Sequence, residues 1–561
     1  MASRPLAPWL LALLLGCGGG PRPFSTGPVL WRDDDMTPFA PKPEEYPSPL
    51  GWNGAQQTIF GPMASALSIK LGREAIDVNA MDEVPDSSWY LNRLSTAPMT
   101  PAEVARGSCP PPIPDQDFPW TVAGAKLEGQ TAGFRIRTHS GKVNFLEFDF
   151  PQQPELATAA GAIGSRLYHA LGFHAVCDRV VFFRAEDLLV PPPGTTRKPV
   201  SREQVDRILA HASKAADGRY RAKASLLAEG ESLGNWTYDG TKGDDPNDVV
   251  PHEDRRELRG TRLVTAWLNH YDTGENNTLA MWIPAGGGKG YVRHYTIDWN
   301  DSLGFLWPPE LDAFSRQLGY AYYFDFDLVG RNFFTLGLIE SPWDRAHYGK
   351  LGPVLGYFDD RDFDPEKWKA GYPNPAFSRM TERDAAWMAR LLARLGPEHI
   401  RALVSEGRIE NPELAEELVR ILQGRREKIL RRYLLRLSSL TDPTVERHGT
   451  ESWLCLHDRA EEAGLGPPPA PSAVHWFSPT TGARLAASHL EGGSVCAVLP
   501  EAAPGFTVVD IETGRPGQGP ARVHLHDGTR IIGLQRPEAG APAPTEPSAN
   551  SQATASGGTP P

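Results

Sequence analysis

The chain has 561 residues, of which 40% are hydrophobic and 9% aromatic, an ordinary composition for a globular protein with two or three domains. Its formal net charge of −12 argues against a nucleic-acid-binding protein, which would show a basic footprint. One local basic cluster runs from Arg425 to Arg436. Apolar residues interleave with it at helical spacing, so we interpret it as the solvated face of a packed helix.

The N-terminus has the pattern of an export signal. A short start with Arg4 precedes an apolar run from Trp9 to Leu15, which is too short to span a bilayer. The sequence Leu14-Leu15-Gly16-Cys17 resembles the bacterial lipobox. That resemblance implies a lipoprotein signal peptide over residues 1–17 and a lipid on Cys17. The alternative is an ordinary secretory signal with an incidental cysteine.

The lipobox resemblance also bears on location. Gly18 stands where enteric lipoproteins of the inner membrane carry an aspartate, which favours the outer membrane of a bacterial cell envelope. No second apolar run is long enough to span a bilayer, so we expect a body held to the membrane by lipid.

Both ends of the chain have linker-like compositions. We interpret residues 18–50 as a flexible tether, with Asp33-Asp34-Asp35 as a solvated charge run, and residues 51–114 as an N-terminal extension. Within this extension, Pro85–Tyr90 is compact and aromatic and is expected to pack against the main domain. Residues 537–561 have almost no apolar bulk and are expected to be disordered.

Four cysteines remain beside Cys17, in a compartment that we expect to be oxidising. Cys455 and Cys496 lie in the same C-terminal module and are candidates for a disulfide, although spacing alone leaves the pairing open.

From Trp120 the pattern changes to strands separated by glycines. Gly129 and Gly133 lie between two such runs, where their backbone N–H groups could cover phosphates or simply form a hairpin. A helix then begins near Glu155 and ends at Gly172, with another strand over residues 180–183. A helix over residues 201–216 and a long polar loop follow.

The most informative motif begins at His270 and has the spacing H-x-D-x-x-x-x-N, with Asp272 and Asn277 in the other fixed positions. Two strand-like runs with a glycine-rich turn between them follow, and Asp298 comes directly after the second. A hairpin brings its open ends together, so oxygens of Asn277 and Asp298 can meet one cation. The alternative is a polar loop in which Asp and Asn cap turns.

Two helical segments and a β-rich module complete the chain. Thr381 and Asn411 have the sequence contexts of helix N-caps, and the helices run to about Leu440. Residues 441–536 contain short strand-like runs with Gly and Pro between them, which indicates a small sandwich or partial barrel.

The body from about Trp120 to Leu440 resembles the protein-kinase-like superfamily, and more closely its atypical branches such as spore-coat-type and secretory kinases. It also resembles uncharacterised bacterial lipoproteins that carry the same hairpin. The resemblance implies an α+β, two-lobed kinase-like domain over residues 115–440 that binds ATP and Mg²⁺. It implies Asp272 as catalytic base, Asn277 and Asp298 as magnesium ligands, and His270 as a support of the loop. It further implies cofactor contacts from Glu155, Lys126, Gly129 and Gly133.

Two positions depart from the kinase pattern. Glu147 stands on the third strand where such kinases carry a lysine, and a carboxylate there would repel phosphate. Lys126 or Lys142 could substitute from nearby. Asn300 stands where the family has glycine, although asparagine tolerates positive φ better than most residues.

Three hypotheses follow. The chain is an exported kinase whose acceptor is a protein, a glycan or a small molecule, or a catalytically dead pseudokinase that serves as an envelope scaffold, or a lipoprotein with a coincidental motif. We expect the first, because three of its polar roles are filled.

Overall fold

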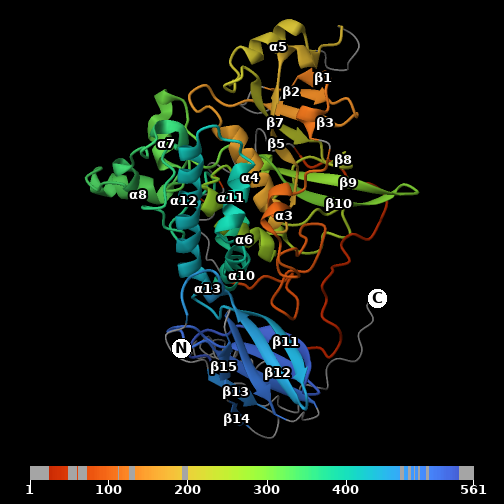
Figure 1. The fold of residues 1–561 in the computed structure, drawn as a ribbon, viewed down its shortest axis with the longest axis vertical. Coiled ribbons are helices and arrows are strands. Elements are labelled where there is room, and N and C mark those ends of the chain that lie inside the picture. Colours follow the sequence, from red (N-terminus) through yellow and green to blue (C-terminus); the bar gives the residue numbers. More distant parts are fainter. Residues whose placement is uncertain are drawn as a thin grey trace, which may run out of the picture.

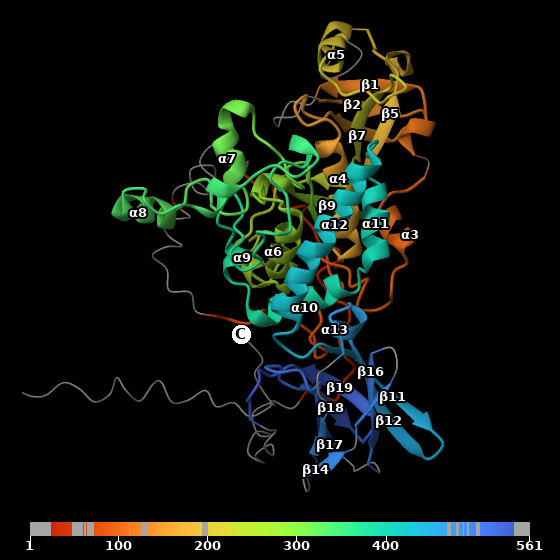
Figure 2. The same ribbon diagram turned by 60° about the vertical axis from the view of Figure 1, so that its left-hand side comes forward.

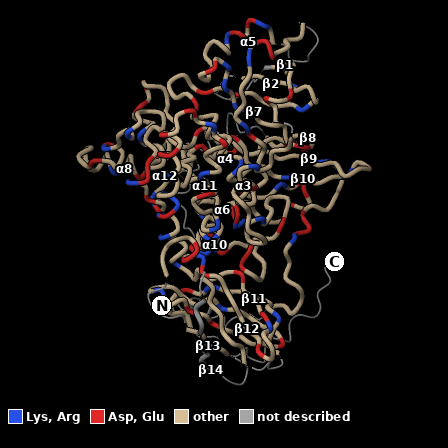
Figure 3. The backbone as a smooth tube through the Cα atoms, in the orientation of Figure 1, with Lys and Arg blue, Asp and Glu red and all other residues tan. Residues whose placement is uncertain are grey.

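The computed structural model describes residues 24–47, 60, 63, 72–111, 113–125, 133–192, 200–467, 473–477, 482–485, 487–490, 493–500 and 505–542. The chain is α+β, as expected, and contains several sheets. Three parts follow one another along the long axis: a six-stranded sheet at one end, a helical part in the middle and a β sandwich at the other end (Figure 1). Basic and acidic residues are interspersed over all three parts (Figure 3).

The six-stranded sheet has the order β5-β7-β3-β2-β1-β6, and only the β1–β6 pair is parallel. One face is apolar and packs against Val205 and Leu209 of helix α5 (Arg202–Leu209), which begins at the Ser201 N-cap. The other face lies against helix α4 (Leu156–Ala170). The strands are β1 (Trp120–Ala125), β2 (Gly133–Arg137), β3 (Val143–Glu147), β5 (Asp178–Phe183), β6 (Leu188–Leu189) and β7 (Tyr220–Leu226).

Strand β7 was not expected, because its sequence reads as polar. Ala222 and Ala224 join the apolar face, whereas Arg221 and Lys223 alternate with them and point toward α4. Both charged side chains are almost fully buried, at 1% and 2% exposure. Burial of an alternating charged face is possible here because each cation has a carboxylate partner.

The helical part is built around α6 (Arg256–Leu268), α10 (Glu382–Ala393), α11 (Pro397–Ser405) and α12 (Pro412–Ile429). The N-caps expected at Thr381 and Asn411 are confirmed, because their side chains accept hydrogen bonds from backbone N–H groups of the first turn. The other helices outside the six-stranded sheet's part are α3 (Pro101–Arg106), α7 (Asp312–Gln317), α8 (Phe326–Thr335), α9 (Pro375–Ser378) and α13 (Arg459–Glu462).

The expected hairpin is present as β9 (Thr278–Gly286) and β10 (Lys289–Thr296), in a four-stranded sheet of order β4-β10-β9-β8. Its flanking strands are β4 (His174–Ala175) and β8 (Glu231–Ser232). This sheet packs into the main core with the helices.

The basic cluster from Arg425 to Arg436 is only partly the solvated face that we expected, because Arg431 and Arg436 are exposed whereas Arg425 and Arg426 are not. Arg425 and Arg426 are buried and donate to backbone carbonyls near the C-terminal ends of two helices. Arg425 contacts Ala266 and Trp267 of α6, and Arg426 contacts Leu392 and Ala393 of α10. The carbonyls at a helix C-terminus lack intrahelical partners and carry negative partial charge, which explains why guanidinium groups are buried there.

The described part of the expected tether, residues 24–47, lies along the body. Phe39 exchanges backbone hydrogen bonds with Gly290 at the end of the hairpin. Asp35 is buried and accepts hydrogen bonds from the backbone N–H and the hydroxyl of Ser88. Asp35 therefore does not belong to a solvated charge run, because its carboxylate holds the segment in place.

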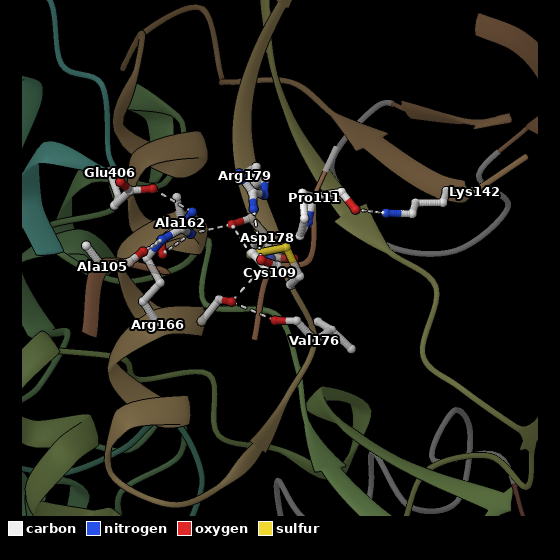
Figure 4. The surroundings of a disulfide bond; sticks show 12 residues. Ala105, Cys109, Pro111, Lys142, Ala162, Arg166, Val176, Asp178, Arg179 and Glu406 are labelled. Carbon is white, nitrogen blue, oxygen red and sulfur yellow. Dashed lines mark hydrogen bonds and ion pairs between the residues drawn. A yellow bond between two sulfur atoms is a disulfide. The ribbon is translucent and has the colours of Figure 1, made fainter. Parts of the chain in front are cut away.

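The extension over residues 72–111 packs into the core of the helical part, as expected for its aromatic stretch. The Trp89 ring stacks on the His294 ring with centroids 3.5 Å apart, and Tyr90 is fully buried. A disulfide between Cys109 and Cys177 joins this extension to the chain just before β5. Beside it, Arg166 of α4 donates to the carbonyl of Asp178 (Figure 4).

The C-terminal module is a sandwich of two antiparallel sheets with the orders β11-β12-β16-β15 and β14-β13-β17-β18-β19 (Figure 2). A disulfide joins Cys455 and Cys496 on neighbouring strands, which confirms the candidate pair. The strands are β11 (Leu440–His448), β12 (Glu451–Asp458), β13 (Ala473–Phe477), β14 (Gly482–Leu485), β15 (Ala487–Leu490), β16 (Ser494–Leu499), β17 (Phe506–Glu512), β18 (Ala521–His526) and β19 (Arg530–Gln535). Among the described residues, no helix is both long and apolar enough to cross a bilayer.

Replacing Cys109 and Cys177 with serine is expected to lower the free energy of unfolding by about 2–4 kcal/mol, because their disulfide closes a long loop. The two cysteines are 68 residues apart, compared with 41 for Cys455 and Cys496. Urea denaturation of the two double-serine variants should show at least as large a loss for the first pair. A negligible loss for that pair would contradict its role in fixing the extension.

Candidate functional site

The loop after α6 carries the first half of the motif. Asn269 ends the helix in a left-handed conformation with φ of 52°, and His270 follows with its ring buried. Burial lowers the pKa of His270 to about 4, while backbone groups of Asp298 and Asp272 favour its protonated form. The ring thus lies near the backbone of both aspartates, which suits the supporting role expected for it.

The hairpin brings Asn277 and Asp298 together as expected. The backbone N–H of Ile297 donates to the carbonyl of Asn277 at 3.0 Å, so Asp298 follows directly at the open end. The side-chain amide of Asn277 donates to the carbonyl of Asp272 at 2.6 Å. Asp272, Asn277 and Asp298 therefore belong to one site.

Asp298 lies at a conformationally unusual position. Its φ of 56° is in the left-handed region, which a non-glycine residue occupies only where the surroundings require it. The next residues pack tightly under α4, where a Cβ on Gly164 would come within 2.5 Å of the Trp299 ring. Close approach of α4 to this loop therefore depends on glycine at position 164.

A lysine reaches this loop from β7. Lys223 Nζ lies 2.6 Å from Glu147 Oε2, 3.6 Å from Asp178 Oδ2 and 3.8 Å from Asp298 Oδ1. Its aliphatic stem crosses α4 at Gly161, where a Cβ would lie 2.4 Å from Lys223 Cδ. Burial alone would lower the pKa of Lys223, but the three carboxylates outweigh it and raise that pKa above its ordinary value.

Asn300 links this cluster on both sides. Its Oδ1 accepts from Lys223 Nζ at 2.8 Å, and its Nδ2 donates to Glu147 Oε2 at 2.8 Å. Asn300 is thus a bridge between the lysine and the strand carboxylate. Glu147 occupies the position expected for the lysine, and in the structure it is the partner of Lys223.

Asp272, Asp298 and Asp301 form an acidic edge of the site. Burial raises the pKa of Asp272, and the charge of Asp298 raises it further. Burial also raises the pKa of Asp301 well above its ordinary value, and the charges of Asp272 and Asp298 raise it further. Lys223 opposes this repulsion only in part, so a cation near these oxygens would stabilise the ionised forms.

The donor set fits magnesium. Mg²⁺ is commonly held by one or two carboxylates together with substrate phosphates; Asp298 offers one carboxylate and Asn277 an amide oxygen beside it. In the part of the chain that the structure describes, no group of three or more His, Cys, Asp or Glu side chains is placed to hold a metal by itself.

Replacing Asp301 with asparagine is expected to increase the free energy of unfolding at pH 8 without magnesium by about 1 kcal/mol or more, and so to raise the melting temperature. The amide resembles the protonated acid, and the folded state of Asp301 binds its proton more tightly than the unfolded state. The gain should therefore shrink as the pH falls toward 5. An equal gain at both pH values, measured by thermal denaturation, would contradict the repulsion.

The other expected cofactor residues are placed differently. Glu155 is the N-cap residue of α4, and its carboxylate lies 4.0 Å from Arg221 and accepts from the backbone N–H of Glu410. Glu147, and not Glu155, is thus the glutamate beside the buried lysine. Gly133 begins β2 and is paired in register with Glu147. Lys126, Gly129 and Cys17 lie outside the described residues.

The site also contains three residues that were not predicted from the sequence, namely Lys223, Asp178 and Asp301. A signal for Lys223 exists in Tyr220-Arg221-Ala222-Lys223-Ala224-Ser225, where cations alternate with small residues at the period of a strand. Asp178 and Asp301 carry no comparable local pattern.

Comparisons of this chain with models of protein families, with curated proteins and with solved structures find no match.

Proposed function

We propose that this chain is a lipid-anchored phosphotransferase of the bacterial cell envelope, with a two-lobed kinase-like domain that uses ATP and Mg²⁺. The observation that carries the proposal is the reach of Lys223 to Asp298 at the loop that holds Asp272 and Asn277. A buried cation, two cation-binding oxygens and a carboxylate of raised pKa are the parts that phosphoryl transfer requires.

Each residue has a defined task in this proposal. Asn277 and Asp298 would hold magnesium, which neutralises charge on the phosphates when it is bound. Asp272 accepts the proton of the acceptor hydroxyl, and its raised pKa suits a general base. Lys223 supplies positive charge at the sheet, and Glu147 and Asn300 fix its ammonium group.

The proposal includes export and anchoring. It rests on the lipobox-like sequence at Cys17 and on the two disulfides, which form in oxidising compartments. The outer membrane is the proposed location, and no nucleic acid is proposed as a partner.

A second function is a pseudokinase that serves as an envelope scaffold. The observation in its favour is that Lys223 is 2% exposed and already has Glu147, Asp178 and Asn300 as close partners. A lysine held in this way can stabilise the fold without contacting a phosphate.

The test is thermal denaturation of the chain that starts after Cys17, with and without Mg-ATP. At a concentration of 100 times Kd, a ligand that binds only the folded state adds about 2.7 kcal/mol. We expect a magnesium-dependent rise in melting temperature that Asp298→Ala abolishes. Asp206→Ala is the matched control, because Asp206 is exposed on α5.

The outcomes separate the two functions. A magnesium-dependent rise together with ADP formation supports the phosphotransferase. A rise without ADP formation favours the pseudokinase, and no rise in the unmutated chain removes the nucleotide site altogether.

A further inference from the structure

A pocket of about 900 Å³ lies in the helical part, beside the loop that carries Asp272. Residues between Leu318 and Glu382 form most of its wall, and Asp327, Leu328 and Arg331 of α8 contribute to it. Helix α8 projects from the body in Figure 1 and Figure 2. The volume lies within the range of small-molecule sites, which is roughly 300–1,000 Å³.

The pocket adjoins this loop, although Asp272 itself is not among the lining residues. Asn269, which precedes the motif, lines the pocket. The backbone N–H of Gly371 donates to the carbonyl of Tyr271 at 2.7 Å, and the following residue, Tyr372, also lines the pocket. Burial raises the pKa of Tyr372 and the carboxylate of Asp272 raises it further, so the pocket wall lies within electrostatic reach of the proposed base.

Half-buried aromatic rings line the wall. Tyr320 and Trp343 pack with ring centroids 6.1 Å apart, and Lys369 Nζ lies 5.0 Å from the centroid of the Tyr322 ring. These rings and Tyr372 are neither fully buried nor fully exposed. Their faces carry negative partial charge and offer apolar surface for a ligand with C–H groups on one side.

The polar part of the lining has almost no net charge. It includes six Lys or Arg and seven Asp or Glu side chains. Lys369 and Asp325 form an ion pair of 2.6 Å, and the lysine side chain is 30% exposed. The lysine ammonium group can donate to a ligand hydroxyl, whereas the Asp325 side chain is only 3% exposed and accepts from the backbone N–H of Leu328. A wall without excess charge does not select an anion.

We propose that this pocket holds the acceptor, and that the acceptor is a neutral polyhydroxylated small molecule of the mono- or disaccharide class. The inference rests on the proposed function and names its substrate class. Sugar rings combine a C–H face, which aromatic rings contact, with hydroxyls, which can accept a hydrogen bond from the ammonium group of Lys369.

The transfer step is balanced with ATP as the donor. The acceptor's O–H bond breaks, and its proton goes to the carboxylate of Asp272. The acceptor oxygen forms a bond to the γ-phosphorus, and the bond from that phosphorus to the bridging oxygen breaks, leaving ADP and a sugar phosphate.

The experiment measures saccharide binding by saturation-transfer NMR on the chain that starts after Cys17. The probes are maltose, glucose and N-acetylglucosamine, with glucose 6-phosphate and adenosine as tests of the class. At least one neutral saccharide should bind, and Trp343→Ala and Tyr320→Ala should each weaken binding about tenfold or more. Phe334→Ala is the control, because that ring is 85% exposed on α8 and does not line the pocket.

The results are read beside the melting shift with Mg-ATP, which the pocket variants should keep. Three outcomes would overturn the inference: no neutral saccharide binds, only glucose 6-phosphate or adenosine binds, or Trp343→Ala leaves saccharide binding unchanged. In each case a melting shift with Mg-ATP would still uphold the proposed function. Saccharide binding without any Mg-ATP shift would overturn the acceptor role and the proposed function together. A bound saccharide that also increases ADP formation supports both.

Discussion

Replacing Lys223 with methionine is expected to destabilise the folded chain by about 3–5 kcal/mol, because removal of one partner from a buried ion pair leaves the other charges uncompensated. Glu147 and Asp178 would lose the ammonium group that lies 2.6 and 3.6 Å from them. Urea denaturation at pH 8 measures the loss. Lys289→Met is the matched control, since Lys289 is exposed at the start of β10.

The pH dependence of that loss identifies its cause. Burial already raises the pKa of Asp178 to about 6 with Lys223 present. Without the lysine, carboxylates in this cluster bind protons more tightly when folded than when unfolded, so the variant should gain stability as the pH falls from 8 toward 5. The double variant Lys223→Met/Glu147→Gln should recover part of the loss.

An equal loss at pH 5 and pH 8, with no recovery in the double variant, would mean that packing of the lysine stem and not its charge stabilises the fold. In that case Lys223 would be a structural residue. The proposed role at the phosphates would then lose its support.

Local signals in the sequence were enough for several elements. The N-caps at Thr381 and Asn411 and the hairpin of β9 and β10 depend on residues a few positions apart, and all are present. The proximity of Asn277 to Asp298 follows from the hairpin alone. These features could be predicted because the interactions that specify them are short in sequence.

Features that depend on distant partners were missed. Arg425 and Arg426 form a basic run that reads as surface, but each contacts carbonyls of another helix. Strand β7 reads as a polar loop because its inward face is charged. Carboxylates of β3, β5 and the Asp298 loop around Lys223, and Asp149 beside Arg221, make that face suitable for burial.

The candidate site shows the same division. Asp272, Asn277 and Asp298 come from one continuous stretch, whereas Lys223 and its partners Glu147 and Asp178 come from three strands. Glu147 looked like a defect when the lysine was sought on the same strand. It is an ion-pair partner once the neighbouring strand is known.

Replacing Asp272 with asparagine is expected to lower the rate of ADP formation by about 10²- to 10⁴-fold, which is the usual contribution of a general base. Asparagine keeps the size of the side chain and can still hydrogen-bond to Asn276. It cannot take up the proton of an acceptor hydroxyl at neutral pH. The measurement is ADP release with the best saccharide acceptor, or with water.

The same variant should still bind nucleotide, because Asp272 is not one of the proposed magnesium ligands. Its melting temperature should rise with Mg-ATP as that of the unmutated chain does, whereas Asp298→Ala should show no rise. Loss of the melting shift in Asp272→Asn would assign this carboxylate to binding and not to proton transfer.

Stability gives the last distinction. Burial and Asp298 both raise the pKa of Asp272, so the folded chain favours an uncharged group at this position. The asparagine variant should therefore fold at least as stably as the unmutated chain at pH 8. A rate loss in a protein of equal or greater stability cannot come from unfolding, and it would place proton transfer at Asp272. An unchanged rate would remove Asp272 as the base, and another group would then have to take the acceptor's proton.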